Sequence, residues 1–84
     1  MSELENLKKR LLYRASYRGT KEMDILLSKF VKKNIDKFNI TQLKDLEKFL
    51  NFDDEIILNY YNSDQKEKNI DKNQVAIIFK EFKI

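Results

Sequence analysis

The sequence predicts an all-α fold, a small bundle of five helices. The chain has 84 residues, no proline and a single glycine, Gly19, so it carries few of the signals that mark β-turns. Its apolar residues recur at spacings of three and four, which is the period of an amphipathic helix. A chain of this length buries roughly two thirds of its unfolded surface when it folds. We therefore expect residues 1–84 to form one domain around one core.

The first predicted helix begins at Ser2, where the sequence Ser2-Glu3-Leu4-Glu5 is typical of a capping box. Gly19 is expected to end this helix as a residue with left-handed backbone. Thr20 is expected to cap a second helix over about residues 20–34. The apolar stripes of the two helices are Leu4, Leu7, Leu11, Leu12 and Ala15, then Met23, Leu26, Leu27, Phe30 and Val31.

Three further helices are predicted from polar residues that precede apolar stripes. Thr41 is the expected cap of the third helix, Asp53 of the fourth and Asp71 of the last, with a linker near residues 63–69 before the last helix. Gln74 stands at the position that would complete a capping box with Asp71. The three stripes are Leu43, Leu46, Phe49 and Leu50, then Ile56, Ile57, Leu58, Tyr60 and Tyr61, then Val75, Ile78, Phe79 and Phe82.

The composition excludes several kinds of chemistry. The chain contains no cysteine and no histidine, so it has no thiolate nucleophile, no imidazole base and neither the thiolate nor the imidazole ligands of zinc. Adjacent carboxylates occur at residues 53–55, but acidic residues are common at helix starts. We therefore expect neither an enzyme nor a metal site.

The basic residues gather in the first part of the chain. The net charge is +3, and residues 1–38 hold ten lysines and arginines against five acidic residues. At helical spacing Arg10, Arg14 and Arg18 form one row, and Tyr13 and Tyr17 form a row beside it. Basic residues among aromatics can bind nucleic acid, and they are also typical of a solvated helix face. A small nucleic-acid-binding protein is therefore one hypothesis for this chain.

A second candidate site is the segment Arg18-Gly19-Thr20-Lys21-Glu22, followed by Asp24. It places Arg18 before a sharp turn between two helices and Glu22 after that turn. The same pattern arises where one helix ends at a glycine and the next helix carries an acidic residue in its first turn, with no function involved. The spacing alone leaves both interpretations open.

The segments Arg10-Leu11-Leu12-Tyr13, residues 18–24 and residues 26–30 together resemble the SdhE family, the FAD assembly factors of succinate dehydrogenase. The Arg-Gly-x-x-Glu pattern at residues 18–22 is the signature of that family. Residues 52–55 are similar to an acidic turn of that family. Asn59 and Tyr60 are similar to the asparagine and aromatic residue that follow this turn in the family. The similarity covers about residues 8–62. The sequence departs from the family pattern at two positions. Tyr17 stands where the family usually has a basic residue, and Tyr60 stands near the position of an expected tryptophan.

The resemblance implies a helical protein that binds the flavoprotein subunit of succinate dehydrogenase, and in some organisms fumarate reductase. It would promote covalent attachment of FAD to a histidine of that partner. The chain lacks the glycine-rich turn that usually receives a pyrophosphate, so we expect it to hold no FAD stably itself. The partner-binding residues implied are Arg10, Tyr13, Tyr17, Arg18, Gly19, Glu22, Asp24 and Tyr60.

The resemblance also gives these residues roles. Arg18 and Glu22 would make charge-assisted contacts, Gly19 would allow close approach of the backbone, and Asp24 would support the corner. The tyrosines would anchor the partner or else cover the protein's own core. The acidic N-terminus and the short apolar runs predict no targeting signal and no membrane insertion, so a bacterial cytoplasmic protein is expected.

Overall fold

The computed structural model describes residues 2–83, and every regular element in that range is helical. Five α-helices are present, as predicted, together with one 3₁₀ segment that the sequence pattern did not predict. The elements in order are α1 (Glu3–Ser16), α2 (Lys21–Asn34), α3 (Ile40–Phe49), α4 (Asp54–Ser63), the 3₁₀ segment η1 (Glu67–Lys72) and α5 (Gln74–Glu81).

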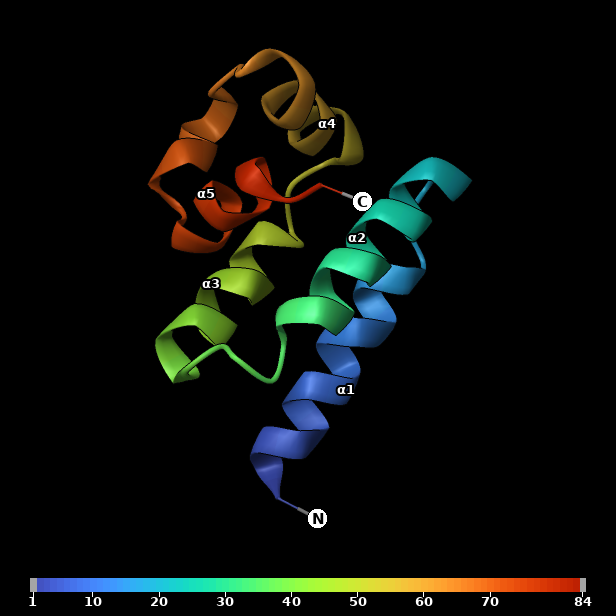
Figure 1. Cartoon of the computed structure of the whole chain (residues 1–84), viewed down its shortest axis with the longest axis vertical. Helices are drawn as coiled ribbons and strands as arrows, with labels where there is room; N and C mark the ends of the chain where they lie inside the picture. The colour runs from blue at the N-terminus through green and yellow to red at the C-terminus, as the bar shows by residue number, and fades with distance from the viewer. Residues whose placement is uncertain (1, 84) are drawn as a thin grey trace.

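The helices form an elongated body of 40 × 26 × 20 Å. Figure 1 shows α1 and α2 side by side as an antiparallel hairpin, while α3, α4 and α5 gather on one side of it. Helix α3 packs against α5 and also contacts α1. The hairpin turns at residues 17–20, at the end of the molecule away from the N-terminus. This corner lies on the same end as the connection between α3 and α4.

Phe30 of α2 lies at the centre of the core. Its ring is fully buried, and its centroid lies 5.0 to 6.5 Å from those of four other phenylalanines, on α3, on α5 and in the segments after α2 and α5. The predicted stripe of α2 is buried at all five positions, which confirms its central place in the bundle. The four phenylalanines around Phe30 are Phe38, Phe49, Phe79 and Phe82.

The stripe of α1 is only partly buried. Leu11 and Ala15 are inaccessible to solvent, Leu7 and Leu12 are partly buried, and Leu4 is exposed. Figure 1 shows the reason, since the first turns of α1 extend beyond the end of α2 and have no helix opposite them. Ser2 caps α1 as predicted, because its side chain accepts a hydrogen bond from the Glu5 amide.

Two of the predicted N-terminal caps are wrong. Helix α3 begins at Ile40, because Asn39 and Gln42, rather than Thr41, form its reciprocal capping box. Helix α5 begins at Gln74 and is capped by Asn73, because Asp71 lies inside the 3₁₀ segment. In both helices another polar residue within two positions of the predicted one makes the cap.

Asn73 also ties α5 to α3. Its side-chain oxygen accepts from the amides of Val75 and Ala76, at 2.9 and 3.0 Å. Its Nδ2 donates to the carbonyl oxygen of Asp45 in α3, at 2.8 Å. Within residues 2–83, Asn73 is the polar residue that is classed as buried, and its side-chain oxygen and nitrogen both form hydrogen bonds with the backbone of the protein.

Replacement of Asn73 by alanine is expected to lower the free energy of unfolding by about 2 kcal/mol. The loss combines a missing helix cap with the lost hydrogen bond from Asn73 Nδ2 to the Asp45 carbonyl oxygen, at about 1 kcal/mol each. For a domain of this size the midpoint of thermal unfolding should fall by roughly 8–16 °C. The matched control is Asp71→Ala, at the cap position that the sequence pattern predicted, and it should change stability by less than about 0.5 kcal/mol. Equal losses in the two variants would contradict the role of Asn73.

Helix α4 begins at Asp54, directly after the predicted cap Asp53, but the Asp53 side chain makes no capping hydrogen bond to the helix. Helix α4 continues to Ser63 and ends at Asp64, whose backbone is left-handed. Residues 64–66 lie outside regular structure, and η1 follows them. Within residues 2–83, none of the helices combines the length and the apolar character needed to cross a membrane.

Candidate functional site

Arg18 joins the corner between α1 and α2 to the connection between α3 and α4. Its Nε donates to Oδ1 of Asp54 at 2.7 Å. Its two terminal nitrogens donate to the carbonyl oxygens of Leu50 and Phe52, at 2.7 and 2.8 Å. The Arg18 side chain is only 11% exposed. A planar guanidinium that satisfies three acceptors in one loop holds that loop in a fixed position relative to the corner.

The backbone of the corner is fixed by two carboxylates. The Arg18 amide donates to Oδ1 of Asp24, and the Gly19 amide donates to Oδ2 of Asp54 at 2.9 Å. Asp54 therefore accepts from both Arg18 and Gly19, one bond on each oxygen. Asp24 supports the corner from α2. Together these bonds set the path of the chain between the two helices.

The predicted left-handed conformation of Gly19 is wrong. Helix α1 ends at Ser16, with Tyr17 as its C-cap, and Gly19 does not have a positive φ. A Cβ atom at Gly19 would lie 3.1 Å from Oδ2 of Asp54, which is tighter than ordinary packing. Glycine is thus favoured here because it permits the close approach of Asp54 to the backbone.

The row of arginines on α1 faces the α3 side of the molecule. Arg10 forms an ion pair with Glu47 of α3 at 3.5 Å, and Arg14 donates to the side chain of Asn51. With Arg18 they form a seam of contacts between α1 and the residues of α3 and of the following loop. Of the three, Arg18 has its guanidinium largely buried, while Arg10 stays exposed.

The tyrosines of the predicted site divide into two kinds. Tyr13 and Tyr17 are 64% and 70% exposed, and their ring centroids lie 4.5 Å apart. Tyr60 is only 4% exposed and packs into the core, which is one of the two roles that the sequence left open for it. Burial raises the pKa of the Tyr60 hydroxyl, with smaller contributions from nearby carboxylates. Tyr13 and Tyr17 thus form an exposed aromatic pair beside the corner.

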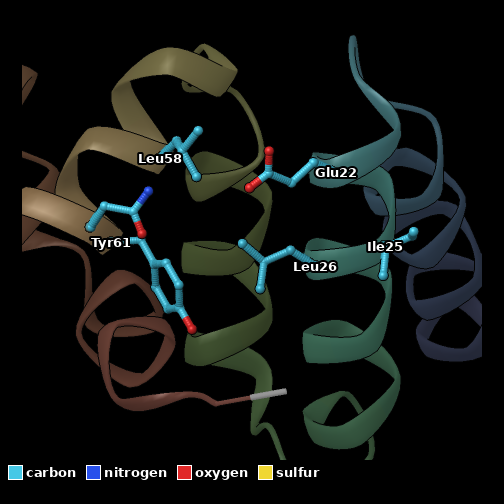
Figure 2. Close-up of a pocket in the computed structure, with 6 residues that line it drawn as sticks. Glu22, Ile25, Leu26, Leu58 and Tyr61 are labelled. Carbon is cyan, nitrogen blue, oxygen red and sulfur yellow. The ribbon is translucent and has the colours of Figure 1, made fainter.

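Glu22 lies in the first turn of α2 and is exposed. Its carboxylate has no hydrogen-bond or ion-pair partner among residues 2–83. It lines a groove of about 290 Å³ between α2 and α4, whose other walls are mainly apolar (Figure 2). Glu22 therefore differs from Asp24 and Asp54, whose carboxylates are bonded within the protein.

A second, polar hollow of about 400 Å³ lies over the side chains of Arg18 and Asp54. It is lined by Arg14, Tyr17, Arg18, Gly19 and residues 50–54. No cluster of three acidic side chains suited to a metal ion occurs within residues 2–83. The corner thus presents a rigid polar hollow, an exposed aromatic pair and a free carboxylate on one end of the molecule, features suited to contact with another macromolecule.

Sequence reasoning missed the part that Asp54 has in the site. The sequence pattern indicates Asp54 only as one of the carboxylates at the start of a helix, and 36 residues separate it from Arg18. The helical spacing indicates Leu58 and Tyr61 only as members of an apolar stripe and gives no sign of the groove. The similarity at residues 52–55 was the one sequence signal that pointed to this loop.

Comparison with known proteins gives one family. A family model described as "Flavinator of succinate dehydrogenase" matches residues 9–83, and so includes the C-terminal part of the chain. No solved structure matches the chain significantly.

Curated relatives have related names. "Succinate dehydrogenase assembly factor 2, mitochondrial" from Dictyostelium discoideum is 42% identical over 60 residues, which is 71% of this chain and 43% of the relative. "FAD assembly factor SdhE" from Acetobacter pasteurianus is 43% identical over 47 residues, 56% of this chain and 43% of the relative. "Succinate dehydrogenase assembly factor 2-B, mitochondrial" from Drosophila melanogaster is 44% identical over 48 residues, 57% of this chain and 31% of the relative. The matched segments thus span less than half the length of these relatives.

Proposed function

The chain belongs to the Sdh5 family, the flavinators of succinate dehydrogenase, and from this we propose that it binds the flavoprotein subunit of that enzyme and promotes covalent attachment of FAD to one of its histidines. Fumarate reductase is a further candidate partner in the same reaction. The proposal is supported by the family match over residues 9–83 and by a preformed surface at the corner between α1 and α2.

The histidine that receives the flavin must belong to the partner, since this chain contains none. The chain also has no cysteine to act as a nucleophile. We therefore propose that it acts through binding rather than through catalysis of its own. A protein that binds one conformation of its partner more tightly than the others raises the population of that conformation. If flavin and histidine are aligned in it, their effective concentration rises and the bond forms faster.

The observation that carries this proposal is the clamp made by Arg18 and Asp54. It fixes the backbone at Gly19, so the surface around the corner is already ordered before a partner arrives. A preformed surface loses little conformational entropy on binding, which favours affinity. Tyr13 and Tyr17 supply exposed aromatic area next to this corner, and aromatic residues are common anchors in interfaces.

The structure supports different roles for the two charged residues of the signature. The Arg18 guanidinium donates inward at three positions, so we propose that Arg18 mainly positions the corner. The Glu22 carboxylate is exposed and unpaired within the described residues, so it is the better candidate for a direct contact with the partner. Arg10 of α1 is exposed, and we propose that it makes a peripheral contact.

Binding can be tested with the purified flavoprotein subunit prepared without FAD. Titration calorimetry is expected to show a one-to-one complex with a Kd in the micromolar range or tighter. The control is an unrelated flavoprotein of similar size prepared without FAD, which should show no measurable affinity for this chain. If the folded chain shows no affinity for the FAD-free subunit, the proposed function is wrong.

A further inference from the structure

We propose that the groove between α2 and α4 receives a cationic side chain, a lysine or an arginine, of the flavoprotein partner. This inference rests on the proposed function and adds the chemistry of one contact. Figure 2 shows Glu22 and Leu26 of α2 on one side of the groove and Leu58 and Tyr61 of α4 on the other. Ile25 and Asn62 complete the lining.

The walls of the groove are suited to an aliphatic chain. Leu26, Leu58 and Tyr61 present mainly carbon to the groove, and the Tyr61 hydroxyl is already bonded to the Phe82 carbonyl. The side chains of lysine and arginine have three or four methylene groups that pack on apolar surfaces while the charged head stays at a polar edge. The walls therefore accept the stem of such a side chain.

The charge of the groove selects the head group. Glu22 is the charged residue of the lining, and its carboxylate has no partner within residues 2–83. When a partner covers this groove, water is removed from the carboxylate, and a buried charge without a counter-charge is costly. A lysine or arginine head group supplies that counter-charge together with a charge-assisted hydrogen bond. A purely apolar or acidic occupant would leave Glu22 uncompensated.

The size of the groove favours a side chain over a cofactor. Its volume is about 290 Å³, at the lower limit of the 300–1,000 Å³ that is typical of small-molecule sites. A dinucleotide such as FAD needs a site well above that limit. Glu22 also lies three residues after Gly19, so the groove adjoins the corner, and one partner surface can contact both.

The test compares two glutamates that differ in their surroundings. Glu22 and Glu55 each lie in the first turn of a helix and are exposed, but Glu55 does not line the groove. Glu22→Gln keeps the size of the side chain and removes its charge, and it is expected to weaken binding of the FAD-free flavoprotein subunit about tenfold or more. Glu55→Gln should change the Kd less than about twofold. Both variants should keep the thermal midpoint of the wild type within a few degrees.

Alanine substitution of the lysines and arginines on the partner then identifies the occupant. One of these substitutions is expected to weaken binding to the wild-type chain about tenfold and to have little further effect on binding to the Glu22→Gln variant. If the wild-type chain binds and Glu22→Gln binds equally well, this inference is wrong while the proposed function stands. The same conclusion follows if no cationic residue of the partner shows coupling to Glu22. If the wild-type chain does not bind at all, the proposed function fails, and this inference fails with it.

Discussion

Replacement of Arg18 by alanine is expected to lower the free energy of unfolding by about 3 kcal/mol, because breaking a largely buried charge network leaves its partners unpaired. The carbonyl oxygens of Leu50 and Phe52 and one oxygen of Asp54 lose their donors together. The thermal midpoint should fall by roughly 12–24 °C, as measured by circular dichroism. Arg18→Lys should recover only a small part of this loss, because a lysine cannot reproduce the planar fork of donors.

Arg10 provides the control for this prediction. It belongs to the same row of arginines and lies on α1, but its ion pair with Glu47 is exposed and long, at 3.5 Å. Exposed pairs of this kind contribute at most about 1 kcal/mol, so Arg10→Ala should shift the midpoint by only a few degrees. Similar losses for Arg10→Ala and Arg18→Ala would show that the clamp at the corner has no special importance for stability.

Replacement of Gly19 by arginine is expected to abolish binding of the flavoprotein subunit, with a Kd at least a hundredfold higher. Gly19 is exposed at the corner, and a long side chain there would stand between the corner and any partner that approaches it. The fold should stay helical, because the backbone at Gly19 is in an ordinary conformation. A moderate loss of stability is expected, since the new Cβ would lie 3.1 Å from Oδ2 of Asp54.

Gln65→Arg is the matched control for Gly19→Arg. It adds the same side chain at an exposed position outside the helices, beyond the end of α4 opposite to Asp54. The length of α4 separates the two ends by about 14 Å. Gln65→Arg should bind the flavoprotein subunit as the wild type does. If Gly19→Arg is folded and binds normally, the corner is not the interface.

The helical fold could be predicted from the sequence because the responsible signals are local. The stripe of α2 follows the helical period, and its residues are buried as the period requires. Caps were less predictable, since several polar residues stand near each helix start and packing decides among them. Asn73 is the cap of α5 because its amide also reaches the Asp45 carbonyl of α3, a contact that depends on the tertiary fold.

The candidate site was predicted in part. Residues 18–24 were singled out correctly as a corner between helices, because the glycine and the flanking charges are close in sequence. The inward direction of the Arg18 side chain could not be predicted, because its acceptors lie 32 to 36 residues away. Burial of Tyr60 and exposure of Tyr13 likewise depend on which face of each helix meets the core. Partner contact by these residues stays a prediction.

We propose that this chain speeds covalent flavin attachment to its partner. The most direct test of this effect uses purified flavoprotein subunit without FAD, free FAD, and the chain added or left out. In-gel flavin fluorescence after denaturation measures the covalent product over time. We predict that the wild-type chain increases the rate of covalent attachment at least tenfold and that Gly19→Arg does not. Equal rates with and without the folded wild-type chain would contradict the account.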